Sequence, residues 1–392
     1  MRSHRLLVLV LLLTVVVALG AYATLPYARA ASLIVRAAGL GGRAEALADA
    51  QAYEVRAQPK HMVPTRHGDV VAQFYVPDAT PRRTVLMMPG FNSFGVDEPR
   101  VASLAADLAG SGFRVMAMAL PDLQRFRLTP AATDVIEDAV AWLAAQPESV
   151  APDGRVGVIA VSFTGGLSVS AAGRQRVRDK IAFVVSLGGH GDLRRVMRFL
   201  ATGDAPRVAG VDPPGAPHDY GVAVILNGLA DRGVVPSDQV QPLRDAIATF
   251  LVASQLTVGD QAAADRMYAK AREMTERLPE PSRTYMRFVN ERAVGELGSV
   301  LVPFLDQLGA DDRSLSPELA PPPSAPVYLL HGRDDNIIPA VESILLADAL
   351  EARGAEVEVL LSGLITHAQV SASATASDAW QLIRFWTNIL QE

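Results

Sequence analysis

The sequence predicts an α/β protein with a mostly parallel central sheet that is covered by helices and interrupted by a helical insertion. From about residue 52, short apolar runs typical of buried strands alternate with segments that carry apolar residues at helical spacing. The alternation stops between Gly189 and Pro326, where helical segments follow one another almost without strands. A proline-rich connector, 317–326, then leads back to the alternating pattern.

Composition excludes several classes of protein. The 392-residue chain is 49% hydrophobic and 20% charged, which provides for a large core and excludes wholesale disorder. Because it contains no cysteine, it has no disulfide, thiolate nucleophile, cysteine-ligated zinc or iron–sulfur cluster. Its formal net charge of −6 argues against nucleic-acid binding, which normally needs a basic surface.

The N-terminal residues form the most apolar part of the chain. Arg2 and Arg5 precede an uncharged stretch, 6–28, whose first part is almost entirely Leu and Val. A basic start followed by an apolar run is typical of an export signal. Residues 6–23 are also about long enough for one helix to span a bilayer, with the two arginines left in the cytoplasm. We therefore expect an N-terminal hydrophobic helix.

Two positions in this region have the small residues that signal cleavage requires. They are Ala21-Tyr22-Ala23 and Ala28-Arg29-Ala30, and Pro26 precedes the second. Residues 1–30 are thus expected to be either a signal peptide or a transmembrane signal anchor, and the sequence leaves both open. Either one places the main body outside the cytoplasm. Residues 31–51 are expected to be a short helix or tether.

The first part of the α/β core is expected over 52–189. Two early strands precede a short apolar run at 84–88 that Pro89-Gly90 stops, as in a buried strand. Strands and helices then alternate up to Gly189. The expected strands are 53–56, 70–76, 84–88, 113–120, 155–161 and 181–187, and the expected helices are 99–110 and 133–146.

The insertion is expected over 190–325 and the second part of the core over 326–392. The insertion has one weak candidate strand, 221–226, and otherwise helical segments at 193–201, 240–256, 261–278 and 282–308. The second part continues with strands at 327–330 and 357–361 and helices at 341–353 and 377–390.

Three polar residues follow three of these strands, at the sheet edge where open α/β sheets form their sites. After 155–161 comes Ser162, followed by Phe163-Thr164-Gly165-Gly166 and a helix. A tight strand-to-helix turn exposes a serine Oγ, and the helix N-terminus favours developing negative charge. After 327–330 comes His-Gly-Arg-Asp-Asp-Asn-Ile-Ile-Pro, and after 357–361 a segment that ends in His367. The chain order is therefore Ser, Asp, His.

This order resembles the α/β-hydrolase superfamily, whose triad runs Ser, Asp, His along the chain. The most specific motif is His-Gly-x-x-Asp-x-x-Ile-Pro at 331–339, and its register selects Asp335 rather than Asp334 as the acid. The resemblance covers roughly the two core parts, and the insertion lies where that family often carries a helical lid. Pro89-Gly90-Phe91 lies where the family has its oxyanion turn.

The resemblance implies a serine hydrolase that cleaves a carboxylic ester, or a related acyl bond, through an acyl-enzyme. Ser162 would be the nucleophile, His367 the general base, and Asp335 the group that orients the histidine. The backbone N–H groups of Phe91 and Phe163 would hold the oxyanion. Candidate substrate-binding residues beside these turns are Asn92 and His190.

Several departures from the family pattern leave other functions open. Ala160 and Thr164 replace the outer glycines of Gly-x-Ser-x-Gly, and Pro89 stands where histidine is commoner. A non-catalytic protein of the same fold that binds a ligand or partner therefore stays an alternative, as does a serine peptidase or thioesterase.

The expected partner is a small-molecule ester or acyl substrate, not a nucleic acid. The membrane is a further partner if the N-terminal helix is uncleaved. No H-E-x-x-H or comparable spacing predicts a metal, and no G-x-G-x-x-G or Walker-type loop predicts a nucleotide cofactor. The natural substrate and the oligomeric state are not readable from the sequence.

Overall fold

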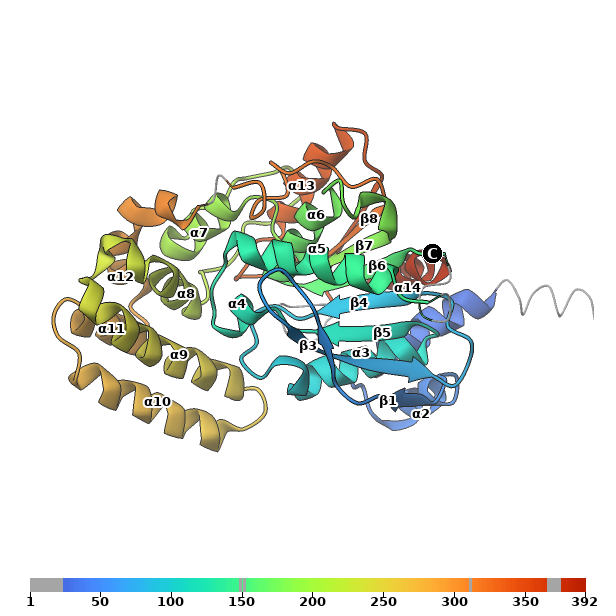
Figure 1. Ribbon diagram of the computed structural model, residues 1–392, viewed down its shortest axis with the longest axis horizontal. Coiled ribbons are helices and arrows are strands. Elements are labelled where there is room, and N and C mark those ends of the chain that lie inside the picture. Colours follow the sequence, from blue (N-terminus) through green and yellow to red (C-terminus); the bar gives the residue numbers. More distant parts are fainter. Residues whose placement is uncertain (1–23, 148–149, 151–152, 310–311, 365–374) are drawn as a thin grey trace, which may run out of the picture.

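The computed structural model describes residues 24–147, 150, 153–309, 312–364 and 375–392. Its centre is one mixed sheet with the strand order β1-β3-β5-β4-β6-β7-β8-β9, and β2 pairs with β3 beside it (Figure 1). The strands are β1 Val55–Ala57, β2 His61–Val63, β3 Val70–Pro77, β4 Thr84–Met88, β5 Arg114–Met118, β6 Val156–Val161, β7 Ile181–Leu187, β8 Val327–Gly332 and β9 Val357–Ser362.

The predicted, mostly parallel sheet is confirmed. β4 pairs in parallel with β5 and β6, and parallel pairing continues through β7 and β8 to β9. The pairs that β1, β2 and β5 make with β3 are antiparallel. All five residues of β4 are buried, as are all six of β8, because helices cover both faces of a parallel sheet. The carboxyl ends of β4, β6, β7 and β8 therefore meet at one edge.

Two hydrophobic clusters lie on the two faces of the sheet. On one face, β4 and β5 pack with α3, α14 and a helix over residues 24–37, which we call the N-terminal helix. The other face packs with α5, α6 and α13, and this cluster continues into the insertion. The core helices are α2 Gly42–Asp49, α3 Pro99–Gly110, α4 Pro121–Gln124, α5 Pro130–Ala144, α6 Phe163–Ala172, α13 Val341–Glu351 and α14 Ala376–Gln391.

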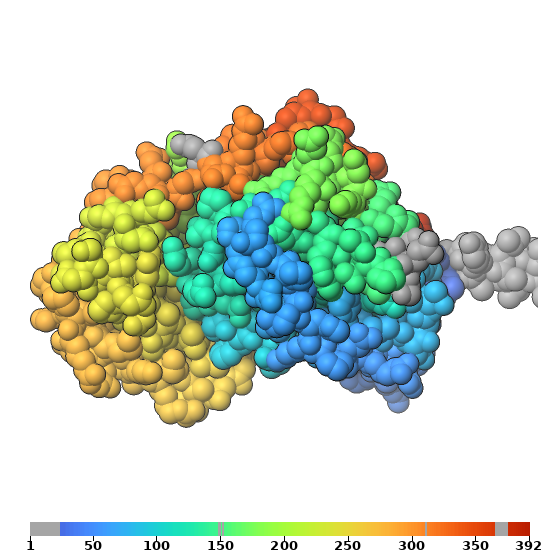
Figure 2. Space-filling view, in the orientation of Figure 1, coloured from blue at the N-terminus to red at the C-terminus, as the bar shows by residue number. Residues whose placement is uncertain are grey.

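The described residues of the insertion form helices joined by irregular segments, with no strand, and they gather at one end of the sheet (Figures 1 and 2). The weak strand expected at 221–226 is wrong, because these residues lie in a helix. Their apolar run is buried among the other helices of the insertion, so all sides of the helix can be apolar. The helices are α7 Leu193–Thr202, α8 Tyr220–Leu229, α9 Val240–Leu256, α10 Gln261–Glu276, α11 Ser282–Glu291 and α12 Val294–Leu301. Short helical turns are η1 Gly95–Asp97, η2 Arg178–Lys180, η3 Ala230–Val234, η4 Ser237–Gln239 and η5 Val302–Leu308.

The N-terminal helix is fastened to the body. Ala30 and Leu33 are buried in the cluster formed with α3 and α14, and Ser32 Oγ donates to the Ala48 carbonyl of α2 at 2.7 Å. Arg36 forms an ion pair with Asp107 of α3 at 3.0 Å. The segment 31–51 thus comprises the last part of the N-terminal helix and α2, and both of these helices contact the core.

The expected apolar helix at 6–23 lies outside the described residues, as does most of the segment 1–30. Within the described ranges, no helix has both the length and the apolar character to cross a membrane. Pro26 lies in the first turn of the described part of the N-terminal helix.

Candidate active site

The turn between β6 and α6 places Ser162 at the meeting edge of the strands. β6 ends at Val161 and α6 begins at Phe163, so Ser162 alone makes the turn. Its φ of 58° and ψ of −139° are unusual for a residue with a side chain. A Cβ on Gly90 would lie 2.8 Å from the Ser162 Cβ, so the oxyanion turn approaches this closely only because residue 90 is glycine.

The two unusual positions around Ser162 fit the turn. Ala160 is fully buried in β6, where it pairs with Met88 and Ser186 on the neighbouring strands. Thr164 lies in the first turn of α6, and its hydroxyl donates to the Pro89 carbonyl at 2.7 Å. Thr164 therefore ties the serine turn to the oxyanion turn, a contact that the sequence did not reveal.

The predicted oxyanion turn, Pro89-Gly90-Phe91, also contacts the insertion. The Gln255 side chain of α9 donates to the Phe91 carbonyl at 2.9 Å and accepts from the Ser93 hydroxyl at 2.9 Å. The Phe91 ring contacts the buried Phe163 ring, with centroids 5.2 Å apart. Phe91 and Phe163 thus lie on the two turns that flank Ser162. Sequence reasoning missed Gln255, because a glutamine on an amphipathic helix carries no local signal of such a role.

Asp335 is buried directly after β8, whereas its neighbour Asp334 is exposed. One carboxylate oxygen of Asp335 accepts the backbone N–H groups of Ile337 and Ile338 at 2.8 and 3.0 Å, which fixes its orientation. His331 is fully buried and bonds Ser343 and a backbone carbonyl, in keeping with a structural role.

The two candidate substrate-binding residues are placed differently. Asn92 lines the cavity, but its amide is engaged in its own loop, where it donates to the Gly95 carbonyl and accepts from the Phe94 N–H. His190 is fully buried behind α6, and its Nε2 bonds the Leu315 carbonyl at 2.7 Å. Burial lowers the pKa of His190 to about 4. The sequence places His190 after β7 but does not show the direction in which its side chain points.

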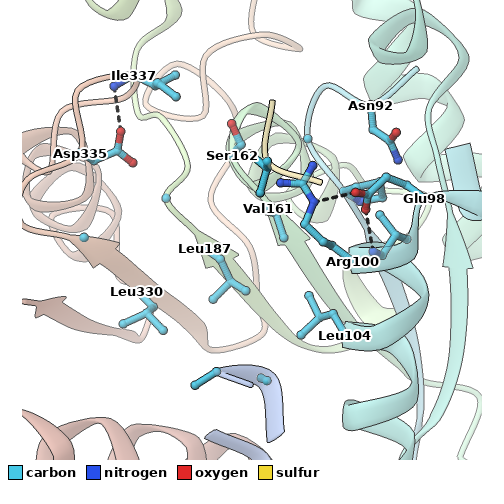
Figure 3. Close-up of a pocket in the computed structure, with 18 of the residues that line it drawn as sticks. Asn92, Glu98, Arg100, Leu104, Val161, Ser162, Leu187, Leu330, Asp335 and Ile337 are labelled. Atoms are coloured by element: carbon cyan, nitrogen blue, oxygen red, sulfur yellow. Dashed lines mark hydrogen bonds and ion pairs between the residues drawn. The ribbon is translucent and has the colours of Figure 1, made fainter. Parts of the chain in front are cut away.

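One cavity of about 890 Å³ joins Ser162, Asp335, Phe91 and Asn92 (Figure 3). His367, the predicted base, lies outside the described residues. The described part of the site therefore holds the predicted nucleophile and acid on one cavity. Among the described residues, no group of three or more His, Asp or Glu side chains could hold a metal ion.

The insertion adds two residues beside Asp335 that sequence reasoning did not place in the site. His218 and Tyr220 both line the cavity, and the His218 N–H donates to the Asn336 carbonyl at 2.9 Å. Burial and the charge of Asp335 raise the pKa of the Tyr220 hydroxyl, so it stays neutral. His218 also pairs with Asp219 at 3.0 Å.

These features define an α/β-hydrolase-like fold. It consists of a mostly parallel sheet covered on both faces, a serine alone on a tight strand-to-helix turn, and a buried aspartate after a later strand. The resemblance that the sequence motifs indicated is thus confirmed at the level of the fold.

Comparison with known proteins finds similarity in structure but none in sequence. No protein-family model and no curated protein sequence matches the chain. A hyperthermophilic esterase from Pyrobaculum calidifontis is similar in structure, with 15% identity, coverage of 88% of this chain and 87% of that one, and a TM-score of 0.46. Carboxyl esterase 2 from the fungus Tuber melanosporum shows 13% identity, 86% coverage of both chains and a TM-score of 0.45. An acylaminoacyl peptidase from Pyrococcus horikoshii shows 9% identity, coverage of 87% of this chain and 41% of that one, and a TM-score of 0.41.

Proposed function

We propose that the protein is a serine hydrolase that cleaves a carboxylic ester or related acyl bond, with Ser162 as the nucleophile. The conformation of Ser162 carries this proposal. A serine that merely caps a helix takes an extended conformation and accepts a backbone hydrogen bond with its side chain. Ser162 has a φ of 58° and its side chain makes no such cap. Such strained conformations cost about 1–3 kcal/mol and cluster at active sites.

The proposed reaction has two halves. His367 takes the proton of the Ser162 hydroxyl as Oγ attacks the carbonyl carbon, and Asp335 stabilises the resulting imidazolium. The N–H groups of Phe91 and Phe163 hold the oxyanion, and His367 then protonates the leaving alcohol. Water attacks the acyl-enzyme by the reverse route and releases the acid. The assignment of His367 rests on its sequence position alone.

A non-catalytic protein was an alternative because Ala160 and Thr164 replace the outer glycines of the serine motif. The geometry of the turn weakens this reason. Both residues fit the turn, and Thr164 fastens it to the oxyanion turn at Pro89. A serine peptidase or thioesterase would use the same residues, so substrates rather than geometry distinguish them.

A fluorophosphonate probe tests the proposal directly, because it labels an activated serine. The wild-type protein is expected to be labelled and Ser162→Ala to lose the label. Ser254→Ala is the matched control, since Ser254 lines the same cavity, and it should keep the label. A folded wild type that resists labelling, or a Ser162→Ala variant that labels fully, would overturn the proposal. Ester, thioester and peptide substrates then identify the bond cleaved.

We further propose that the basic start and apolar run within residues 1–23 direct export, as a signal peptide or an anchor. Cleavage after Ala23 would keep the N-terminal helix whole, whereas cleavage after Ala30 would cut it at a buried residue. Sequencing the N-terminus of the protein recovered from membrane and exported fractions tests this. A mature chain that begins at Ala31 would contradict the preference for Ala23.

A further inference from the structure

The cavity at Ser162 extends well beyond the two catalytic turns. It continues along one face of the sheet and reaches α3, α14 and the N-terminal helix. Leu104, Leu187 and Leu330 border the same open space as Ser162 in Figure 3. This part of the cavity is not needed to hold a small acyl group, so its lining indicates what else the substrate carries.

The N-terminal helix presents an apolar stripe to this space. Ala31, Ile34 and Val35 line the cavity from neighbouring positions on the helix, and Ala38 lines it just after the helix ends. Ala30 and Leu33 of the same helix are buried against the body, and Ile34 of the stripe packs against the same cluster. The packing of this helix against the body therefore holds the stripe in place beside the cavity.

The last helix, α14, presents a second stripe of the same kind. It consists of Ala379, Leu382, Ile383 and Trp386, again at helical spacing. On the exposed side, the rings of Tyr27 and Trp380 stack with centroids 5.3 Å apart, which joins α14 to the N-terminal helix. The two helices thus form one continuous apolar wall.

The charge at this end of the cavity is balanced. Glu98 and Arg100 at the start of α3 line it, and they form an ion pair with each other at 2.6 Å. The side chains that the two helices and the ends of β4, β6, β7 and β8 contribute are apolar, among the described residues. Polar groups would lose hydration here without a partner, so the matching ligand portion is uncharged and apolar.

We propose, on the basis of the proposed function, that this end of the cavity binds a long aliphatic acyl chain whose carbonyl lies at Ser162. The N-terminal helix is the wall that limits the chain length. At about 890 Å³ the cavity lies in the upper part of the range for ligand sites. Each buried methylene group adds roughly fourfold to affinity. Affinity should therefore rise steeply with chain length until the chain reaches the wall.

Binding of fatty acids to Ser162→Ala tests the site without catalysis. Saturated acids of four to sixteen carbons, kept below their micelle concentrations, are titrated by calorimetry. Affinity is expected to rise by more than a hundredfold over the series. Ile34→Trp should cost the long acids at least tenfold and leave the four-carbon acid unchanged. Leu25→Trp is the matched control on the exposed part of the same helix and should have no effect.

A second blocking variant, Ile383→Trp on α14, keeps the test valid if Ile34→Trp fails to fold. Affinity that does not depend on chain length, or an equal loss in Leu25→Trp, would overturn the inference. Hydrolysis of p-nitrophenyl esters separates the two proposals. If short esters are hydrolysed but fatty acids bind without length dependence, only the acyl site fails. If fatty acids bind as expected but no ester is hydrolysed, only the proposed function fails.

Discussion

At the level of residues, the approach of Gly90 to Ser162 fixes the spacing of the candidate catalytic groups. A side chain at residue 90 would meet the Ser162 Cβ at 2.8 Å and the Val161 carbonyl at 3.3 Å, and neither belongs to a flexible side-chain end. The turn must shift to accept even a methyl group. The proposed oxyanion turn and the proposed nucleophile are thus in contact through a glycine, and activity should depend on this glycine.

We expect Gly90→Ala to lower kcat/KM for a short ester by about a hundredfold, the effect of losing one oxyanion donor. Because both turns lie at the sheet edge, the free energy of unfolding should fall by only about 1–3 kcal/mol. Steady-state kinetics and urea unfolding check this. Gly215→Ala is the control, since nothing lies near its added Cβ. Unchanged kinetics in Gly90→Ala would contradict the assigned oxyanion turn.

The buried His190 predicts how stability responds to pH. Its pKa in the folded protein, about 4, lies below the usual 6.5, so protons bind preferentially to the unfolded chain. Its contribution to stability is therefore complete above pH 6.5 and is lost as the pH falls toward 4, by up to about 1.4 kcal/mol per pH unit. His190→Gln should show a weaker loss in urea unfolding between pH 7 and 5. An unchanged slope would contradict this.

Predictions for single residues succeeded where a motif fixed the direction of the side chain and failed where it did not. The register of the motif at 331–339 distinguished Asp335 from Asp334, because the motif fixes which aspartate turns inward. His190 was expected near the substrate, but α6 packs over it and it does not line the cavity. The sequence shows that a residue follows a strand, but not which layer its side chain enters.

At the level of elements, α9 of the insertion holds the proposed oxyanion turn. Gln255 is the contact, since it bonds both the Phe91 carbonyl and the Ser93 hydroxyl. The position of this turn depends on the insertion as well as on the sheet. Loss of the Gln255 contact should therefore lower the reaction rate more than the stability of the fold.

Gln255→Leu should lower kcat/KM by about tenfold, the upper end of what one hydrogen bond contributes. The midpoint of urea unfolding should change little, because Gln255 is only half-buried. Gln241→Leu is the matched control, an exposed glutamine on the same helix. Equal effects of the two substitutions on kcat/KM would show that the contact with Phe91 has no role.

The sequence largely predicted which segments form strands and which form helices. The segments that differ do so for physical reasons. β4 and β7 have the predicted bounds because Pro89 and Gly188 stop apolar runs that no helix pattern explains. Residues 221–226 were an apolar run of the same kind, yet they form a helix. Periodicity cannot separate a buried strand from a helix that is buried on all sides.

At the level of the whole molecule, a buried ionic cluster joins the insertion to the second part of the core. Arg195 of α7 bonds Glu342 of α13 at 2.5 Å and Glu318 of the proline-rich connector at 2.5 Å. The Glu342 side chain is 1% exposed. Removing Arg195 would leave this carboxylate buried without its cation, which is costly.

Arg195→Ala is therefore expected to lower the free energy of unfolding by about 3–5 kcal/mol. Its neighbour Arg194 forms an exposed ion pair with Asp306, so Arg194→Ala should cost less than about 1 kcal/mol. Urea unfolding of the two variants measures the difference. Similar losses would mean that the cluster does not hold the insertion in place.

The position of the N-terminal helix has a consequence for how related chains with the proposed activity would diversify. The stripe that includes Ile34 and Val35 precedes the sheet, the insertion and every proposed catalytic residue in the chain. Its side chains border the cavity beyond the two proposed catalytic turns. Changes there can alter substrate range while the chemistry is preserved, so related chains that share the serine turn should diverge first in this helix.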